Sequence, residues 1–111
     1  MTAGHVARVG AICLALPGAT ERLSHGEPTF FVRGKMFAIF ADNHHGDGRI
    51  AVWLPVPDGM QQSVIDAAPH VFLKPPYVGA RGWVGIDLDQ VTGIELESHI
   101  GLAWEWVRRK R

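Results

Sequence analysis

The sequence predicts an α+β fold of two layers, in which helices pack on one antiparallel sheet. Apolar residues recur at helical spacing near both ends of the chain. Between them, aromatic and β-branched runs alternate with glycine-containing turns of hairpin length. The strand–helix–strand rhythm that indicates a parallel sheet is absent. We expect the element order α-β-β-β-α-β-β-α.

The first helix is expected to start at a Thr2 cap and to end at Pro17-Gly18. Its apolar face is formed by Val6, Val9, Ile12, Cys13 and Leu16. A buried thiol in apolar surroundings keeps a high pKa and stays inert. We therefore interpret Cys13 as a packing residue rather than a nucleophile.

A strand-rich block follows this helix. Residues 29–33 and 35–40 flank Gly34, and glycine supplies the positive φ that a tight hairpin turn requires. Residues 49–54 form another strand after a turn-rich loop, and residues 20–24 add a short edge strand.

The middle helix is expected to begin with a capping-box-like pair, Asp58 and Gln61, and to end at Pro69. Residues 71–73 read as a short strand. Residues 83–88 alternate, so one face of this last strand faces the core. That face consists of Val84, Ile86 and Leu88.

The last helix begins at a capping box formed by Thr92 and Glu95. Its apolar stripe consists of Leu96, Ile100, Ala103 and Val107. This spacing places the four side chains on one helical face, which we expect to pack on the sheet.

The composition indicates a single domain over residues 1–111, with 47% hydrophobic and 20% charged residues. No apolar run reaches the ~18 residues of a membrane helix, and no secretory signal is recognisable. Cys13 is the only cysteine, which excludes an internal disulfide and is typical of a reducing compartment. We expect a cytoplasmic protein.

The charges are unevenly distributed, although the formal net charge is zero. Residues 108–111 carry four of the eleven basic residues, which leaves seven basic against eleven acidic residues before them. The bulk of the domain therefore lacks the basic bias of an avid nucleic-acid binder, whereas a local basic patch stays open. The basic end is either an arm that contacts phosphate or a set of cations favoured at a helix C-terminus.

Three blocks, in this order, resemble the MmcQ/YjbR family: LPGATE at residues 16–21, HGEPTFFVRGKMFA at 25–38 and PPYVGARGWVGIDLD at 75–89. The resemblance covers nearly the whole chain. It implies a small α+β fold similar to CyaY-like and secretion-chaperone-like domains. It also implies a non-enzymatic DNA-binding function with a double-wing arrangement. His25 departs from the family, which often has tryptophan there.

Five basic residues of the sheet half are candidates for contact with nucleic acid: Arg33, Lys35, Arg49, Lys74 and Arg81. Arg33 and Lys35 flank Gly34 at a hairpin tip, and a wing-like tip can lie along a phosphate backbone. The alternative is that the five are solvated charges or partners of nearby carboxylates.

A small-molecule pocket is an alternative function. His25, Glu27, Tyr77 and Trp83 are candidates to line it, and histidine titrates near neutral pH, as a general base requires. No complete catalytic set accompanies His25, so we predict no enzyme; the plainer alternative is a turn with packed aromatic rings. A protein-interaction scaffold is a further alternative, implied by the secretion-chaperone-like fold.

Two other motifs are interpreted structurally. His44 and His45, with Asp42 and Asp47, lack the ligand spacing of a structural zinc site, so we predict neither a metal nor a cofactor. The glycines of residues 75–85 have the spacing G-x-x-G-x-x-G, which matches no phosphate-binding loop. We interpret this stretch as a crossing that is anchored by Tyr77 and Trp83.

Overall fold

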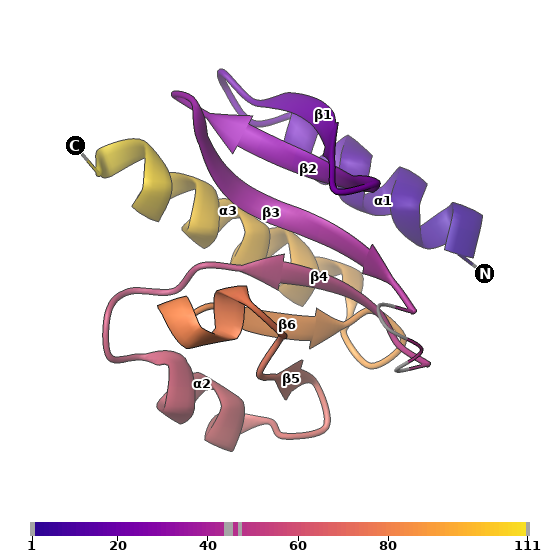
Figure 1. The fold of residues 1–111 in the computed structure, drawn as a ribbon, viewed down its shortest axis with the longest axis vertical. Helices are drawn as coiled ribbons and strands as arrows, with labels where there is room; N and C mark the ends of the chain where they lie inside the picture. Colours follow the sequence, from indigo (N-terminus) through magenta and orange to yellow (C-terminus); the bar gives the residue numbers. More distant parts are fainter. Residues whose placement is uncertain (1, 44–45, 47, 111) are drawn as a thin grey trace.

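The computed structural model describes residues 2–43, 46 and 48–110, and it confirms the α+β fold (Figure 1). Over these residues one antiparallel six-stranded sheet has the order β1-β2-β3-β4-β6-β5. The strands are β1 (Thr20–Ser24), β2 (Glu27–Val32), β3 (Lys35–Asp42), β4 (Ile50–Leu54), β5 (Phe72–Leu73) and β6 (Val84–Asp87). The helices are α1 (Thr2–Leu14), α2 (Gln61–Ala67), the 3₁₀ helix η2 (Val78–Arg81) and α3 (Gly93–Arg109). None of the described helices is both long and apolar enough to cross a bilayer.

Two tight turns fix the register of the first three strands. Residues His25 and Gly26 join β1 to β2, and Arg33 and Gly34 join β2 to β3. All four have positive φ, between 53° and 81°, as a two-residue type I′ hairpin turn requires. The predicted Gly34 hairpin is confirmed, and Arg33 itself adopts the left-handed conformation at its tip.

An irregularity between β2 and β3 decides which side chains face the helices. Phe30 pairs with Ala38 but Phe31 pairs with Met36, so Phe37 is an extra residue on β3. Phe37 and Ala38 are both buried in the core under the helices. Met36 packs instead on the opposite face of the sheet, where Phe31 lines a groove.

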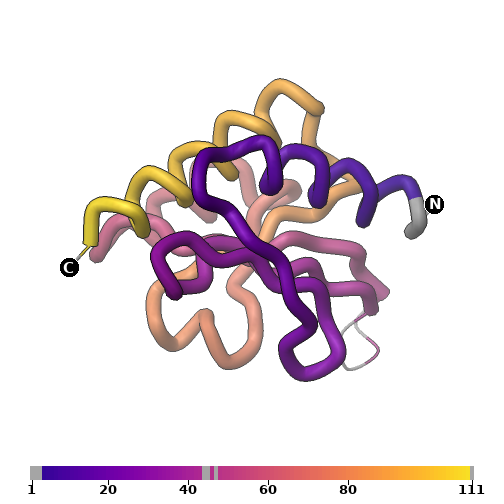
Figure 2. The backbone as a smooth tube through the Cα atoms, turned by 90° about the horizontal axis from the view of Figure 1, so that it is seen from above, coloured from indigo at the N-terminus to yellow at the C-terminus, as the bar shows by residue number. Residues whose placement is uncertain are grey.

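The main core lies between one face of the sheet and helices α1 and α3, which lie on the same side of it (Figure 2). The Thr92 hydroxyl accepts a hydrogen bond from the Glu95 amide at 3.2 Å, which confirms the predicted cap. The predicted apolar residues of both helices and of β6 are confirmed as core: Val9, Cys13, Val84, Ile86, Leu88, Leu96, Ile100, Ala103 and Val107.

A smaller cluster lies on the other face of the sheet, under the segment that contains η2. Its buried members are Ala41, Ala51, Trp53, Val78 and Trp83. Trp53 and Gly85 pair across β4 and β6, so the absence of a side chain at Gly85 leaves room for the indole. The predicted crossing at residues 75–85 therefore covers the face of the sheet that α1 and α3 leave open.

The predicted capping pair of the middle helix is wrong. Helix α2 begins at Gln61, and its N-cap Met60 makes no side-chain capping hydrogen bond. The Gln61 side-chain amide instead donates to the carbonyls of Gly79 and Trp83, both at 2.7 Å. Gln61 therefore ties α2 to the segment that contains η2 instead of capping its own helix, and the two carbonyls border the buried cluster of Val78 and Trp83.

Gly85→Ala is expected to destabilise the protein. An added Cβ would lie 2.8 Å from Leu73 Cδ1, 2.9 Å from Leu73 Cγ and 3.2 Å from Trp53 Cδ1. Overpacking of this kind costs about 1–3 kcal/mol of the free energy of unfolding. Gly101→Ala is the control, because no atom lies within 4 Å of its added Cβ and alanine favours a helix by about 0.5–1 kcal/mol. Urea denaturation measures the free energy of unfolding of both variants. A change of the same sign in Gly85→Ala and Gly101→Ala would contradict this packing.

His99 is expected to make stability depend on pH. Its ring meets Phe72 edge-on at 5.1 Å between centroids, and burial lowers its pKa below 6.5, against an opposing contribution from Glu95. The stability that neutral His99 provides is therefore complete above pH 6.5 and lost as the pH falls through the lowered pKa. His99→Leu should flatten the decline of the free energy of unfolding below pH 6.5. Parallel curves for the two proteins would contradict this assignment.

Candidate functional site

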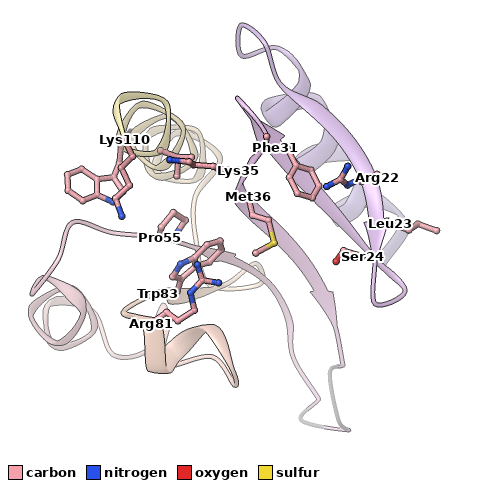
Figure 3. A pocket seen from close by; sticks show the side chains of 13 residues that line it. Arg22, Leu23, Ser24, Phe31, Lys35, Met36, Pro55, Arg81, Trp83 and Lys110 are labelled. Carbon is pink, nitrogen blue, oxygen red and sulfur yellow. The ribbon is translucent and has the colours of Figure 1, made fainter.

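A groove of about 840 Å³ lies over the open face of the sheet and extends to the end of α3 (Figure 3). One wall comes from β1 and the β2–β3 hairpin, and the other comes from η2, Pro55 and the end of α3. Four charged residues line it: Arg22, Lys35, Arg81 and Lys110. All four are cations, and no carboxylate is among the described residues that line the groove. The groove is therefore a site of positive potential on a chain with no net charge.

Aromatic rings position two of these cations. The Arg22 guanidinium carbon lies 4.1 Å from the centroid of the Phe31 ring, and Lys110 Nζ lies 5.1 Å from the Trp106 ring. A ring attracts the cation through its quadrupole but does not neutralise it. These contacts therefore orient the two cations and leave their charge available to an anion.

The five basic residues proposed from the sequence are not all in this groove. Lys35 and Arg81 line it, whereas Arg33 lies beside it at the hairpin turn. Arg49 precedes β4 and lies about 20 Å from Lys35, at the opposite end of β3. The stem of Lys74 packs against Gly79 instead. The strand order of the sheet therefore places the five predicted cations at different sites and not on one binding surface.

Arg22 and Lys110 complete the groove, and neither was selected from the sequence. Arg22 belongs to β1, and it reaches the groove because β1 pairs with β2 beside Phe31. Lys110 follows α3, which carries it across the sheet to the other wall. The only sequence feature that pointed to Lys110 was the basic end of the chain, and this feature does not indicate where the end lies in the fold.

The other described cations of the basic end are paired within the helix. Glu105 accepts hydrogen bonds from Arg108 at 2.8 Å and from Arg109 at 2.6 Å. These bonds lower the pKa of the Glu105 carboxyl, so it stays ionised. Arg108 and Arg109 therefore act as cations at the helix C-terminus, the second of the two interpretations of the basic end. Lys110 alone of residues 108–110 lines the groove.

A second cavity, of about 510 Å³, adjoins the groove, and Ser24 and Met36 line both. It brings together three of the four residues proposed for a ligand pocket: His25, Glu27 and Tyr77. Trp83 lines the groove instead. Thr29, Ile39, Trp53 and Val78 complete the wall of the cavity, which is mostly apolar.

Tyr77 stands out among the residues of this cavity. The residue is 69% exposed, so the prediction that Tyr77 anchors the crossing is wrong; the buried Val78 and Trp83 anchor it instead. The backbone of Tyr77 has φ 60° and ψ −76°, a strained conformation for a residue other than glycine. Strain of this kind persists where the surrounding structure enforces it, and it recurs at ligand-binding segments.

The structure also describes Cys13 and most of the residues that could bind a metal. Cys13 lies in the main core, and burial, with a smaller contribution from Glu21, raises the pKa of its thiol to about 12. The thiol is therefore protonated at neutral pH, as predicted. No group of three metal-ligating side chains occurs in residues 2–43, 46 and 48–110. His44, His45 and Asp47 of the candidate metal cluster lie outside the described residues.

A third cavity, of about 390 Å³, lies between α2, α3 and the segment after β4. Most of its lining is apolar, and it includes the exposed side chains of Met60 and Leu102. His99, Glu105 and Arg109 are its polar residues. Sequence patterns do not indicate this cavity, because its walls come from elements that are distant along the chain.

Comparisons with known proteins agree with this architecture. The family model YjbR matches residues 14–106. A crystal structure of the Deinococcus radiodurans protein DR2400, a DUF419 domain, is similar with a TM-score of 0.78 and 20% sequence identity. The match covers 95% of this chain and 79% of that protein, and it supports the fold. No curated protein matches the chain. Since the family model spans most of its length, the chain belongs to the YjbR family.

Proposed function

We propose that this protein is a non-enzymatic DNA-binding domain that contacts the phosphate backbone through the cationic groove. One observation carries the proposal: the four charged residues that line the groove are all cations. Phosphate contacts from lysine and arginine supply most of the affinity of non-specific nucleic-acid binding. A cytoplasmic location accords with this function and with the single, reduced cysteine.

The distribution of charge makes this function compatible with a neutral chain. Glu105 offsets one of the two positive charges of Arg108 and Arg109 near the groove end of α3, whereas Arg22 and Lys110 lie over aromatic rings. The field that a phosphate meets is therefore local, and it does not depend on net charge. We expect modest affinity that falls steeply as salt is added.

Neutral variants of the groove cations are expected to weaken DNA binding. Lys35→Gln and Arg81→Gln should each reduce the salt dependence, the slope of log K against log[salt], by about 0.7–0.9, because each removes about one phosphate contact. Arg49→Gln is the matched control, since it removes the same charge at the other end of β3. Fluorescence anisotropy with labelled DNA, across a salt series, measures the slopes, and melting temperatures verify folding.

Two results would contradict the proposal. One is the absence of binding at low salt. The other is an affinity that drops equally in Arg49→Gln and in the groove variants, since binding would then reflect overall charge and not this groove.

A small-molecule binding function is the second candidate, and the cavity beside Tyr77 favours it. His25, Glu27 and Tyr77 meet there in a mostly apolar wall, which is the usual composition of a ligand pocket. The carboxylate of Glu27 favours a ligand that carries a hydrogen-bond donor next to an aromatic ring.

A thermal-shift screen tests this second function. A ligand that binds only the folded protein raises its melting temperature, by an amount that grows with ligand concentration. We expect aromatic amines to raise it in the natural chain and to lose most of that effect in Tyr77→Ala. A panel of aromatic amines and neutral metabolites without any shift would count against a pocket here.

A further inference from the structure

We propose that the nucleic acid bound by this protein is single-stranded, with its backbone in the cationic groove and a base in the adjoining cavity beside Tyr77. This inference rests on the proposed function and names the form of the ligand. It follows from the shape of the groove, from the chemistry of the cavity and from the conformation of Tyr77.

The shape of the site favours a single strand. Proteins that read duplex DNA place a projecting helix or β-ribbon into one of its grooves. Here the four cations line a hollow, with Arg22 and Lys35 on one wall and Arg81 and Lys110 on the other (Figure 3). A flexible single strand can enter such a hollow, whereas the backbone of a duplex is held on a stiff rod.

The adjoining cavity has the chemistry of a base site. Tyr77, Trp53 and His25 contribute rings, and Ile39 and Val78 contribute apolar surface. Positive grooves with neighbouring aromatic side chains are the usual arrangement for single strands, because every base presents a face for stacking. Ser24 and Met36 line both hollows. Arg22 lies about 7 Å along β1 from Ser24, and Lys35 is the neighbour of Met36 on β3, so the boundary of the cavity lies close to two cations.

The charges give the bound strand one orientation. Among the described residues, Glu27 is the only carboxylate of the cavity, and every charged residue that lines the groove is a cation. A phosphate is repelled from Glu27 and attracted to Lys35 and Arg81. The amino group of a base, in contrast, can donate a hydrogen bond to a carboxylate. The backbone therefore belongs in the groove and the base in the cavity.

Tyr77 is the residue on which base binding depends most. Its ring is 69% exposed and its backbone conformation is strained, with the Tyr77 carbonyl accepting from the Ala80 amide at 3.1 Å. This backbone is already ordered, so stacking of a base on the exposed Tyr77 does not have to order the segment first. Loss of one such stacking contact should weaken binding by about tenfold.

The test compares two DNA forms with the full chain. Fluorescence anisotropy is measured with a labelled mixed-sequence single strand of about 12 nucleotides. The same measurement uses the duplex of that sequence and a strand of equal length that lacks bases. We expect the single strand to bind at least tenfold more tightly than the duplex, and the base-free strand to bind more weakly than the single strand.

Variants of Tyr77 separate the base site from the groove. Tyr77→Ala should lower the affinity for the single strand about tenfold, leave its salt slope unchanged and leave the base-free strand unaffected. Tyr77→Phe keeps the ring and should bind as the natural chain does. Lys35→Gln should instead reduce the salt slope for every strand. Melting temperatures identify any variant that fails to fold.

The outcomes distinguish this inference from the proposed function. Equal or tighter binding of the duplex would overturn the inference and leave DNA binding intact. Binding of neither form at low salt would overturn both. A preference for the single strand that Tyr77→Ala leaves unchanged would overturn the assignment of the base to this cavity.

Discussion

The packing of α1 and α3 on one face of the sheet is the constraint on which the rest of this structure depends. The apolar stripe of α3, from Leu96 to Val107, covers the strand side chains that point to its side of the sheet and buries them in the main core. The other face is thereby left to the segment that contains η2, which covers only part of it. The groove and the cavity both lie in the remainder, so the site is a consequence of one-sided helix packing.

The segment over the open face is held by specific contacts. Gln61 supplies two hydrogen bonds to its carbonyls, and Gly85 allows Leu73 and Trp53 to approach the strand closely. Val78 and Trp83 anchor its apolar side, so Arg81 and Tyr77 remain at the surface above the sheet. The same packing thus stabilises the crossing and presents two residues of the site.

Electrostatics in this protein are local. Glu105 pairs with Arg108 and Arg109 and offsets one of their two positive charges, whereas cation–π contacts orient Arg22 and Lys110 and keep their charge. The result is a groove whose described lining contains cations and no carboxylate, in a chain of zero net charge. Net charge alone underestimates the positive potential of such a groove, because it sums charges that lie on different faces of the protein.

The sequence by itself determined the local structure: the Thr92 cap, the Gly34 turn and the apolar faces of both long helices. These features follow from hydrogen bonds and periodicities within a few residues. Tertiary structure decided the rest. Gln61 donates its hydrogen bonds to carbonyls 18 and 22 residues away instead of capping its helix. Arg22 and Lys110 line the same groove only because strand pairing and helix packing bring their segments to its two walls. Contacts between distant segments depend on the order of strands in the sheet, which local patterns do not encode.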